Sequence, residues 1–383
     1  MSGQVSRSDM KTVVMYIDFI YGKQNPTGGT NRYRELMYGL IEKGNVVHLF
    51  IPKDAELKSD PHLIRHDIKC YLTSSFLIPN GLLNFLANLK KLSSIRKINY
   101  DAIISFDVPC SVQFKLFNLG KLFLFIRQDF IGYRKISIGS DGLVKRIYMV
   151  VLKRIERSVL LHAHRIAVQC KYDKDILIKR HDGCKSSIEE KMFILNNNVN
   201  PSWVTSETCD DNKKKTNENI KLAFVGDLDD PRKGFGLLIG AVSRLLDEGE
   251  PLTLHVVGGA NCLDHYKNQY RNRPNIKLWG KLKDPLRVTK ECDLLIVPSL
   301  ADSFPNTIIE AFYLELPVIG SNVGGIPEML IYEDLIFTPT VADLVVKLRD
   351  IIHNKKLEML RGYSKQRKKE LTFDWVEKVS ALI

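Results

Sequence analysis

Two acidic residues eight positions apart, Asp302 and Glu310, are the side chains whose types and spacing most clearly suggest chemistry in this sequence. They lie in the stretch LIVPSLADSFPNTIIEAFYLELPVIGSNVGGIPE, residues 295–328. Ionised carboxylates can accept hydrogen bonds from the hydroxyl groups of a sugar. The apolar run before Pro298 predicts a buried strand, and a helix with a buried apolar stripe is predicted from about Asn306.

The turn between this strand and this helix is suited to phosphate. It leaves the first backbone N–H groups of the helix, and the positive end of the helix dipole, at the carboxyl edge of a sheet. A further apolar run at 317–320 and a Gly-Gly turn at 324–325 predict that the strand–helix–strand pattern continues. A phosphate-binding turn beside two acceptors for hydroxyl groups is typical of a nucleotide-sugar site.

Two adjacent cations, Arg232 and Lys233, occupy a second turn of the same kind. They lie in the string VGDLDDPRKGFGLL, between a strand predicted over 222–228 and a helix predicted over 235–246. Cations at such a turn can stabilise the negative charge that develops on a departing nucleoside diphosphate.

Together these motifs resemble the retaining glycosyltransferases of family 4 (glycosyl transferases group 1), which have the GT-B fold. The resemblance rests on the acid-x7-acid string with Glu310-Ala311, on GGIPE after it, on VGDLDDPRKG, and on GGTNRYRELMYGLIEKG at 28–44. The sequence departs from the family pattern where Asp302 replaces glutamate, Gln128 replaces histidine, Asp227 replaces arginine and Asn198 replaces glycine.

The resemblance implies a role for each motif. Glu310 would bind the ribose hydroxyls, Asp302 the hydroxyls of the transferred sugar, and Lys233 with Arg232 the diphosphate; these four are the expected catalytic residues. The other expected donor-binding positions are Gly28, Gly29, Gly226, Phe304, Pro305, Asn306, Thr307, Gly324 and Gly325. Near the donor sugar and the acceptor we expect Arg127, Gln128 and Asp129. A glutamine can donate to a sugar hydroxyl but cannot act as a base.

The spacing of Asp227 and Asp229 matches the Asp-x-Asp pair that binds a divalent metal in the other large glycosyltransferase fold. Here the two acids lie in a turn beside two cations, and the pattern of two sheets does not suit that fold. We therefore expect no metal and no cofactor, with a UDP- or GDP-sugar as the substrate.

Length and periodicity predict two α/β domains. A chain of 383 residues is too long for one ordinary core, and strands alternate with helices in both halves. With the resemblance, this predicts GT-B: two Rossmann-like doubly wound domains that face a cleft. The expected parts are an acceptor-binding domain over 10–200, a nucleotide-sugar domain over 201–365 and a helix over 366–383 that packs back on the first domain. The polar stretch 205–219 is the expected interdomain loop.

The positive charge is concentrated in the first half of the chain. Residues 1–200 contain 31 Lys and Arg against 18 Asp and Glu, whereas the remainder contains 25 against 26. Nucleic acid, an anionic membrane or an acidic acceptor would each explain this excess, and so would an ordinary solvated surface. No basic–aromatic nucleic-acid module is found, so nucleic acid is the least favoured partner.

Location and membrane contact are predicted from apolar runs and cysteines. No run of eighteen apolar residues and no secretory signal is found, and seven scattered cysteines lack a C-x-x-C pair. We expect a cytoplasmic protein that is peripheral on the inner face of the cytoplasmic membrane. The basic amphipathic stretch 80–97 fits membrane contact and packing on the sheet equally well. For 143–161, core packing with a basic outer face is favoured.

The expected reaction moves a hexosyl unit from a nucleotide diphosphate sugar to a glycan or polyprenyl-linked acceptor in cell-surface polysaccharide synthesis. The resemblance implies that the anomeric configuration is retained. No enzymic nucleophile lies in these strings, so the leaving phosphate would accept the proton of the acceptor. Two alternatives stay open. One is a catalytically silent GT-B binding subunit, suggested by Gln128 and Asp227. The other is a GT-B sugar-nucleotide epimerase, which would need acid/base carboxylates and histidines that these strings lack.

Overall fold

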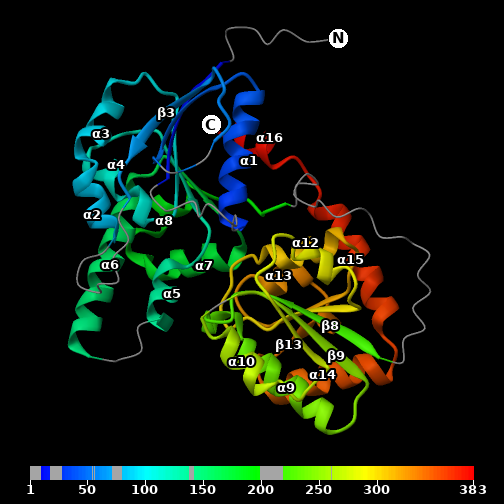
Figure 1. The fold of residues 1–383 in the computed structure, drawn as a ribbon. Helices are drawn as coiled ribbons and strands as arrows, with labels where there is room; N and C mark the ends of the chain where they lie inside the picture. The colour runs from blue at the N-terminus through cyan, green and yellow to red at the C-terminus, as the bar shows by residue number, and fades with distance from the viewer. Residues whose placement is uncertain are drawn as a thin grey trace, which may run out of the picture. The chain divides into compact units, whose positions relative to one another are not determined.

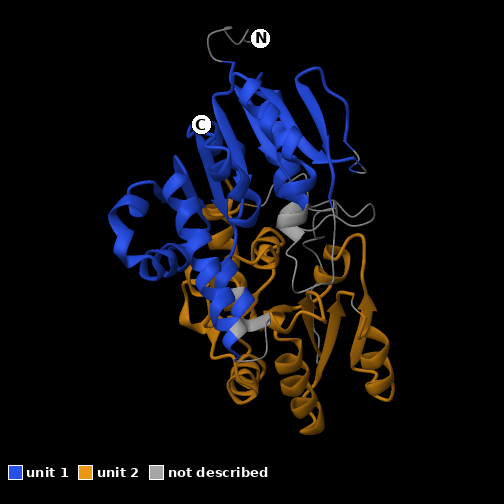
Figure 2. Cartoon of the chain, turned by 90° about the vertical axis from the view of Figure 1, so that its left-hand side faces the viewer, with its two compact units in different colours: residues 1–195, 375–383 blue, residues 196–374 orange. Residues whose placement is uncertain are grey.

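The chain forms two compact units (Figure 2). The computed structural model describes residues 10–17, 28–53, 55, 57–70, 80–137, 142–198, 219–259 and 261–383. Unit 1 comprises residues 1–195 and 375–383, and unit 2 comprises residues 196–374. Most of the polar stretch 205–219, the expected interdomain loop, lies outside the described residues.

Unit 1 is built on a seven-stranded parallel sheet with the order β3-β2-β1-β4-β5-β6-β7. Its strands are β1 (Thr12–Tyr16), β2 (Val46–Pro52), β3 (Leu63–Ile68), β4 (Ala102–Phe106), β5 (Leu122–Ile126), β6 (Arg165–Val168) and β7 (Met192–Ile194). The central strands β4 and β5 are buried along their whole length because both faces of the sheet are covered. The strand order reverses between β1 and β4, which is where doubly wound sheets bind ligands.

The helices of unit 1 connect these parallel strands (Figure 1). They are α1 (Gly28–Glu42), α2 (Asn80–Ala87), α3 (Leu89–Ser94), α4 (Val112–Leu116), α5 (Phe130–Ser137), α6 (Leu143–His162), α7 (Lys171–Arg180) and α8 (Lys185–Glu189). A core of aliphatic and aromatic side chains from the sheet and these helices includes Val14, Phe50, Phe114, Leu124 and Ile166.

The last helix, α16 (Trp375–Ser380), belongs to unit 1 although it follows unit 2 in the chain. It lies beside α1 (Figure 1). A Cβ at Gly39 of α1 would be only 2.7 Å from both methyl groups of Val376, so the glycine permits this close approach. Trp375 is 2% exposed, and the guanidinium of Arg32 lies 4.7 Å from the centre of its ring. The C-terminal helix therefore crosses back to the first domain, as predicted, but it begins at Trp375 and not at 366, because residues up to 371 belong to α15 (Leu357–Leu371) of unit 2.

Unit 2 has a six-stranded parallel sheet with the order β10-β9-β8-β11-β12-β13. Its strands are β8 (Ile220–Val225), β9 (Leu252–Val257), β10 (Ile276–Gly280), β11 (Leu294–Val297), β12 (Val318–Ser321) and β13 (Ile336–Phe337). Its helices are α9 (Phe235–Asp247), α10 (Leu263–Gln269), α11 (Leu286–Thr289), α12 (Asn306–Tyr313), α13 (Ile326–Leu330), α14 (Val341–His353) and α15 (Leu357–Leu371). Helices α9 and α14 pack together on one side of the sheet and α12 with α15 on the other (Figure 1). The prediction of two doubly wound α/β domains is confirmed.

Several element boundaries differ from the sequence-based expectations. The helix expected over 80–97 is interrupted at Asn88, whose side-chain amide donates to the carbonyls of Lys69 and Asn84. The edge strand β3 was not predicted because LIRHDI has exposed polar residues and no apolar run.

The first half of α6 corrects one packing prediction. The apolar side of 143–161 was expected to enter the core, and Val159 and Leu160 do so with at most 1% exposure. The side chains of Leu143, Ile147, Val150 and Val151 are instead 45–73% exposed. No helix within the described ranges is long and apolar enough to cross a membrane.

Candidate functional site

The two turns that the sequence singled out meet at one edge of the sheet in unit 2. The turn after β8 carries Lys233, and the turn after β11 carries Asp302. Lys233 Nζ donates to Asp302 Oδ2 at 2.6 Å, with side chains 31% and 15% exposed. Strands β8 and β11 are neighbours, and the strand order reverses between them. The pair therefore lies at the switch point, beyond the carboxyl ends of the strands, where ligands bind in this class of sheet.

Glycine allows the backbones of these turns to approach closely. Gly234 has φ +67°, and a Cβ there would overlap the carbonyl oxygen of Pro298. Gly324 has φ +58°, and a Cβ there would overlap the carbonyl oxygen of Asp302. Gly325 N also donates to that carbonyl oxygen, at 3.1 Å. Both the left-handed backbone and the lack of space thus require glycine, and the contacts fix the backbone that carries Asp302.

Gly226 and residues 304–307 lie along these turns, and their expected contact with the donor stays a prediction. Gly226 follows β8, and its N–H donates to the carbonyl of Val257 at 3.0 Å. Phe304 and Pro305 are buried, which leaves mainly backbone atoms for a ligand. Helix α12 begins at Asn306, and its N-cap residue, Pro305, makes no side-chain hydrogen bond to the first turn. The first N–H groups of α12, with Thr307 in the first turn, are thus arranged as an anion site would require.

Arg232 differs from its neighbour Lys233. Its guanidinium donates to both carboxylate oxygens of Asp230, at 3.1 and 2.6 Å, and its backbone N–H also donates to Asp230. Asp230 thus neutralises Arg232 locally, whereas Lys233 reaches the other turn. The expected binding of the diphosphate by Arg232 stays a prediction.

Glu310 lies on α12 and is partly exposed. Burial of its carboxyl group, followed by repulsion from Asp284, raises the pKa of Glu310 to about 7. No hydrogen bond to this carboxyl group is found in the described part of the chain. A carboxyl group with a raised pKa and no bound donor is the kind of acceptor that a ligand hydroxyl can satisfy.

Asp229, one acid of the Asp-x-Asp pair, forms hydrogen bonds within the protein. It accepts hydrogen bonds from the backbone N–H groups of Asn261 and Cys262, at 2.7 and 3.2 Å. Bonds from Cys262 and Asn261 lower the pKa of Asp229. Asp227 accepts from the N–H of Asp229 at 3.0 Å. Across the described residues, no group of three or more His, Cys, Asp and Glu side chains is arranged to hold a metal ion.

At the carboxyl edge of the sheet in unit 1, Arg127 is bound by Asp107. The guanidinium donates to Asp107 Oδ2 at 2.9 and 2.5 Å, and the backbone N–H of Arg127 donates to Oδ1 at 2.8 Å. Burial alone would lower the pKa of Arg127, but the Asp107 carboxylate raises it overall. Gln128 follows, half-exposed, and its side chain makes no hydrogen bond to the residues that the structure describes.

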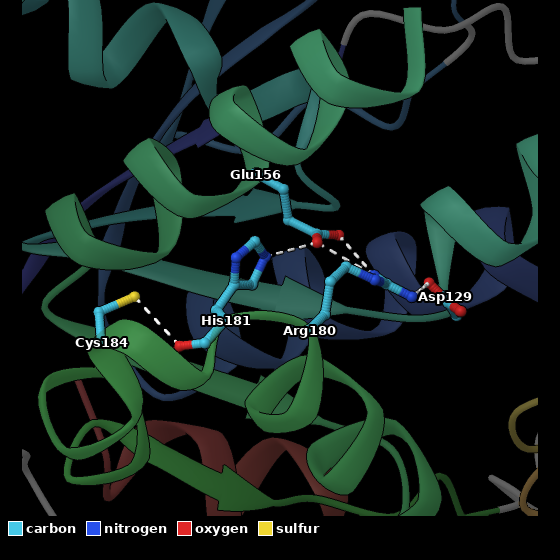
Figure 3. Close-up of polar contacts among 5 residues, drawn as sticks. All are labelled: Asp129, Glu156, Arg180, His181 and Cys184. Atoms are coloured by element: carbon cyan, nitrogen blue, oxygen red, sulfur yellow. Dashed lines mark hydrogen bonds and ion pairs between the residues drawn. The ribbon is translucent and has the colours of Figure 1, made fainter. Parts of the chain in front are cut away.

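Asp129 belongs to a network of ionisable groups (Figure 3). Arg180 Nη2 donates to Asp129 Oδ1 at 2.6 Å, and Arg180 Nη1 donates to both carboxylate oxygens of Glu156, at 3.1 and 3.0 Å. His181 Nε2 lies 2.7 Å from Glu156 Oε2. The side chains of Glu156 and His181 are 2% and 4% exposed. Burial acts to lower the pKa of Arg180, but Glu156 and Asp129 raise it overall.

Sequence reasoning missed the partners Asp107, Glu156 and Arg180. Asp107 had a local signal, because it directly follows the apolar run AIISF that forms β4. Glu156 and Arg180 had none, since each lies in a helix among other charged residues. Gly28 and Gly29 form the start of α1. Their expected contact with the donor stays a prediction, because the loop before them is outside the described residues.

Comparison with known proteins agrees with this geometry. Residues 219–354 match the family described as Glycosyl transferases group 1. The chain is 26% identical over 263 residues to the uncharacterized glycosyltransferase MJ1059 of Methanocaldococcus jannaschii, which covers 64% of this chain and 61% of MJ1059. It is 24% identical over 262 residues to the capsular polysaccharide biosynthesis glycosyltransferase CapM of Staphylococcus aureus, covering 64% and 68%. The match with MJ1059 thus spans less than two thirds of that relative.

Solved structures define the fold class. Sucrose-phosphate synthase from Thermosynechococcus elongatus superimposes with a TM-score of 0.75 at 18% identity, over 97% of each chain. HepE of Anabaena in complex with UDP-glucose gives a TM-score of 0.69 at 16% identity, over 97% of this chain and 98% of HepE. The protein has the GT-B fold.

Proposed function

We propose that the protein is a retaining glycosyltransferase that moves a hexosyl unit from a nucleoside diphosphate sugar to a hydroxyl group of a glycan or lipid-linked acceptor. The observation that carries this proposal is the Lys233–Asp302 pair at the switch point of unit 2, beside the start of α12. Support also comes from the family match over residues 219–354 and from the capsule-related name of CapM. Surface polysaccharide synthesis is the corresponding pathway class.

In this proposal unit 2 binds the donor. The N-terminus of α12 and Lys233 bind the diphosphate, Glu310 accepts from the ribose hydroxyls, and Asp302 accepts from the sugar. The bond between the anomeric carbon and the phosphate oxygen breaks, while the acceptor oxygen bonds to the anomeric carbon on the same face. The leaving diphosphate accepts the proton of the acceptor. Lys233 stabilises the negative charge that develops on the diphosphate, without a metal.

Thermal unfolding with UDP, GDP, ADP, CMP and their sugars tests the donor site. A ligand that binds only the folded protein raises the melting temperature as ln(1 + [L]/Kd). We expect UDP or GDP and its sugar to raise it in the absence of metal, and the same sugar nucleotide to be hydrolysed or transferred. No shift with any of these nucleotides would contradict the proposal. Binding without hydrolysis or transfer would indicate a silent binding subunit.

We further propose that the first half of α6 binds the anionic inner face of the cytoplasmic membrane. The exposed apolar side chains Leu143, Ile147, Val150 and Val151 recur at helical spacing. Exposed cations lie among and beside them, namely Arg146, Lys153, Arg154 and Arg157. The single acid of the helix, Glu156, is buried. An exposed helix face with apolar and basic residues and no acid matches an anionic lipid surface.

Flotation with vesicles tests this surface. We expect the protein to float with vesicles of phosphatidylglycerol and phosphatidylcholine, but not with phosphatidylcholine alone, and binding to weaken as salt increases. Ile147→Glu with Val151→Glu should abolish flotation because two charges would enter the apolar side. The matched control is Val346→Glu on α14 of unit 2, where an apolar side chain is 61% exposed. Equal flotation of both variants would exclude α6 as the membrane surface.

A further inference from the structure

The carboxylate of Asp129 has close neighbours on two sides. On one side Arg180 Nη2 donates to Oδ1 at 2.6 Å. On the other side Oδ2 lies over Gly132 in the first turn of α5, so close that a Cβ at position 132 would overlap it. Asp129 directly precedes α5, and two residues separate it from the end of β5. It therefore lies at the carboxyl edge of the sheet in unit 1. Its side chain remains 18% exposed.

Arg180 is itself fixed by a buried carboxylate. Glu156 on α6 accepts two hydrogen bonds from Arg180 Nη1, and His181 approaches the same carboxylate (Figure 3). Glu156 has a 2% exposed side chain, so it depends on these donors. One guanidinium is therefore shared between an acid in the interior and an acid at the sheet edge. Its planar shape permits this sharing, which a lysine ammonium would not reproduce.

We propose that Arg180, anchored by Glu156, and the absence of a side chain at Gly132 together fix the Asp129 carboxylate in the orientation that sugar transfer requires. Arg180, Glu156 and Gly132 are positioning residues in this scheme, because they act through Asp129. Asp129 then serves as an acceptor for a hydroxyl of the sugar or of the acceptor molecule. This inference rests on the proposed glycosyltransferase function. It explains why the carboxylate of Asp129, at the sheet edge, is paired with the guanidinium of Arg180.

The role of Gly132 yields the sharpest test because two effects have opposite signs. Alanine favours a helix over glycine, so Gly132→Ala should stabilise α5 or leave the protein stable. The added Cβ must nevertheless displace the Asp129 carboxylate. We therefore expect a stable variant whose turnover falls roughly 10- to 100-fold, as small displacements of catalytic groups do. Gly183→Ala, at a position where a Cβ meets open space, is the matched control and should keep full turnover.

Arg180→Lys tests the other side of Asp129. It keeps the positive charge near Glu156 but cannot reach both acids as the guanidinium does. We expect turnover to fall while the affinity for the nucleoside diphosphate, measured by thermal shift, stays unchanged. Each loss should vanish when Asp129 is already alanine, because residues that act through one group are not additive. A full loss that persists in the Asp129→Ala background would overturn the proposal, and so would unchanged turnover in stable Gly132→Ala and Arg180→Lys proteins.

A crystal structure of Gly132→Ala separates failure of this inference from failure of the proposed function. If the wild-type protein transfers and hydrolyses no sugar nucleotide, the proposed function is wrong, and turnover decides nothing about Asp129. The position of the Asp129 carboxylate then decides. If the carboxylate is displaced in Gly132→Ala and its contact with Arg180 is broken, the proposed positioning of Asp129 by Arg180 and Gly132 is supported. An unmoved carboxylate overturns it.

Discussion

Replacing Lys233 by alanine is expected to lower the rate of sugar transfer about 100- to 1,000-fold, which is the cost of removing one group that stabilises developing charge. Lys233 is the cation that reaches across to the turn after β11, where its Nζ lies 2.6 Å from Asp302 Oδ2. Arg232 differs in its contacts, because its guanidinium donates to both oxygens of the Asp230 carboxylate. The measurement is kcat and KM for the sugar nucleotide that gives the largest thermal shift.

Lys368→Ala is the matched control for this experiment. Lys368 also pairs with a carboxylate in unit 2, that of Glu315, at 3.0 Å, and its side chain is 33% exposed against 31% for Lys233. Losing such an exposed ion pair alone costs little. Lys368→Ala should therefore retain wild-type kinetics. Equal kinetics of the two variants would mean that Lys233 merely neutralises Asp302.

The architecture followed from the sequence because both sheets are parallel. Their strands are short apolar runs such as AIISF and LLIV, buried on both faces and separated by helical periodicity. The strands at the sheet edges did not have this signature: β3 has alternating exposed polar residues, and β13 has two residues only. An edge strand is recognised by its hydrogen bonds to the adjacent strand, and a single sequence does not show this pairing.

The same reasoning explains which parts of the site were predictable. The turns with Lys233 and Asp302 were recognised separately by local motifs, and their meeting follows from the order of strands in a doubly wound sheet. The environment of Asp129 was not predictable from the sequence. Arg180 is 51 residues after Asp129, and Glu156 is 24 residues before Arg180. Charged residues on amphipathic helices are usually solvated, so nothing local distinguished Glu156 from its neighbours. Tertiary structure brings the three together, since Asp129 precedes α5, Glu156 lies on α6 and Arg180 lies on α7.

The affinity for the sugar nucleotide is expected to rise about tenfold between pH 6 and pH 8, because the carboxylate form of Glu310 is the better acceptor for hydroxyl groups. Its pKa of about 7 makes most of the side chain protonated at pH 6 and ionised at pH 8. The intact sugar nucleotide, and not the free diphosphate, is the ligand to use, since its phosphates do not titrate in this range. Calorimetric titration at both pH values measures the change, and Glu310→Gln should bind more weakly with no pH dependence.

Stability should change in the opposite direction from binding. The folded-state pKa of Glu310 lies above the unfolded value, so the proton favours folding fully below about pH 4.5 and this contribution is lost as pH rises towards 7. Above pH 7 the ionised, half-buried carboxylate opposes folding. Glu310→Gln, which keeps the shape without the charge, should therefore raise the melting temperature at pH 8 clearly more than at pH 5. A variant that binds less and is more stable identifies Glu310 as a residue kept for the ligand. Equal melting temperatures at pH 8 would instead show that the carboxylate is well solvated in the folded protein.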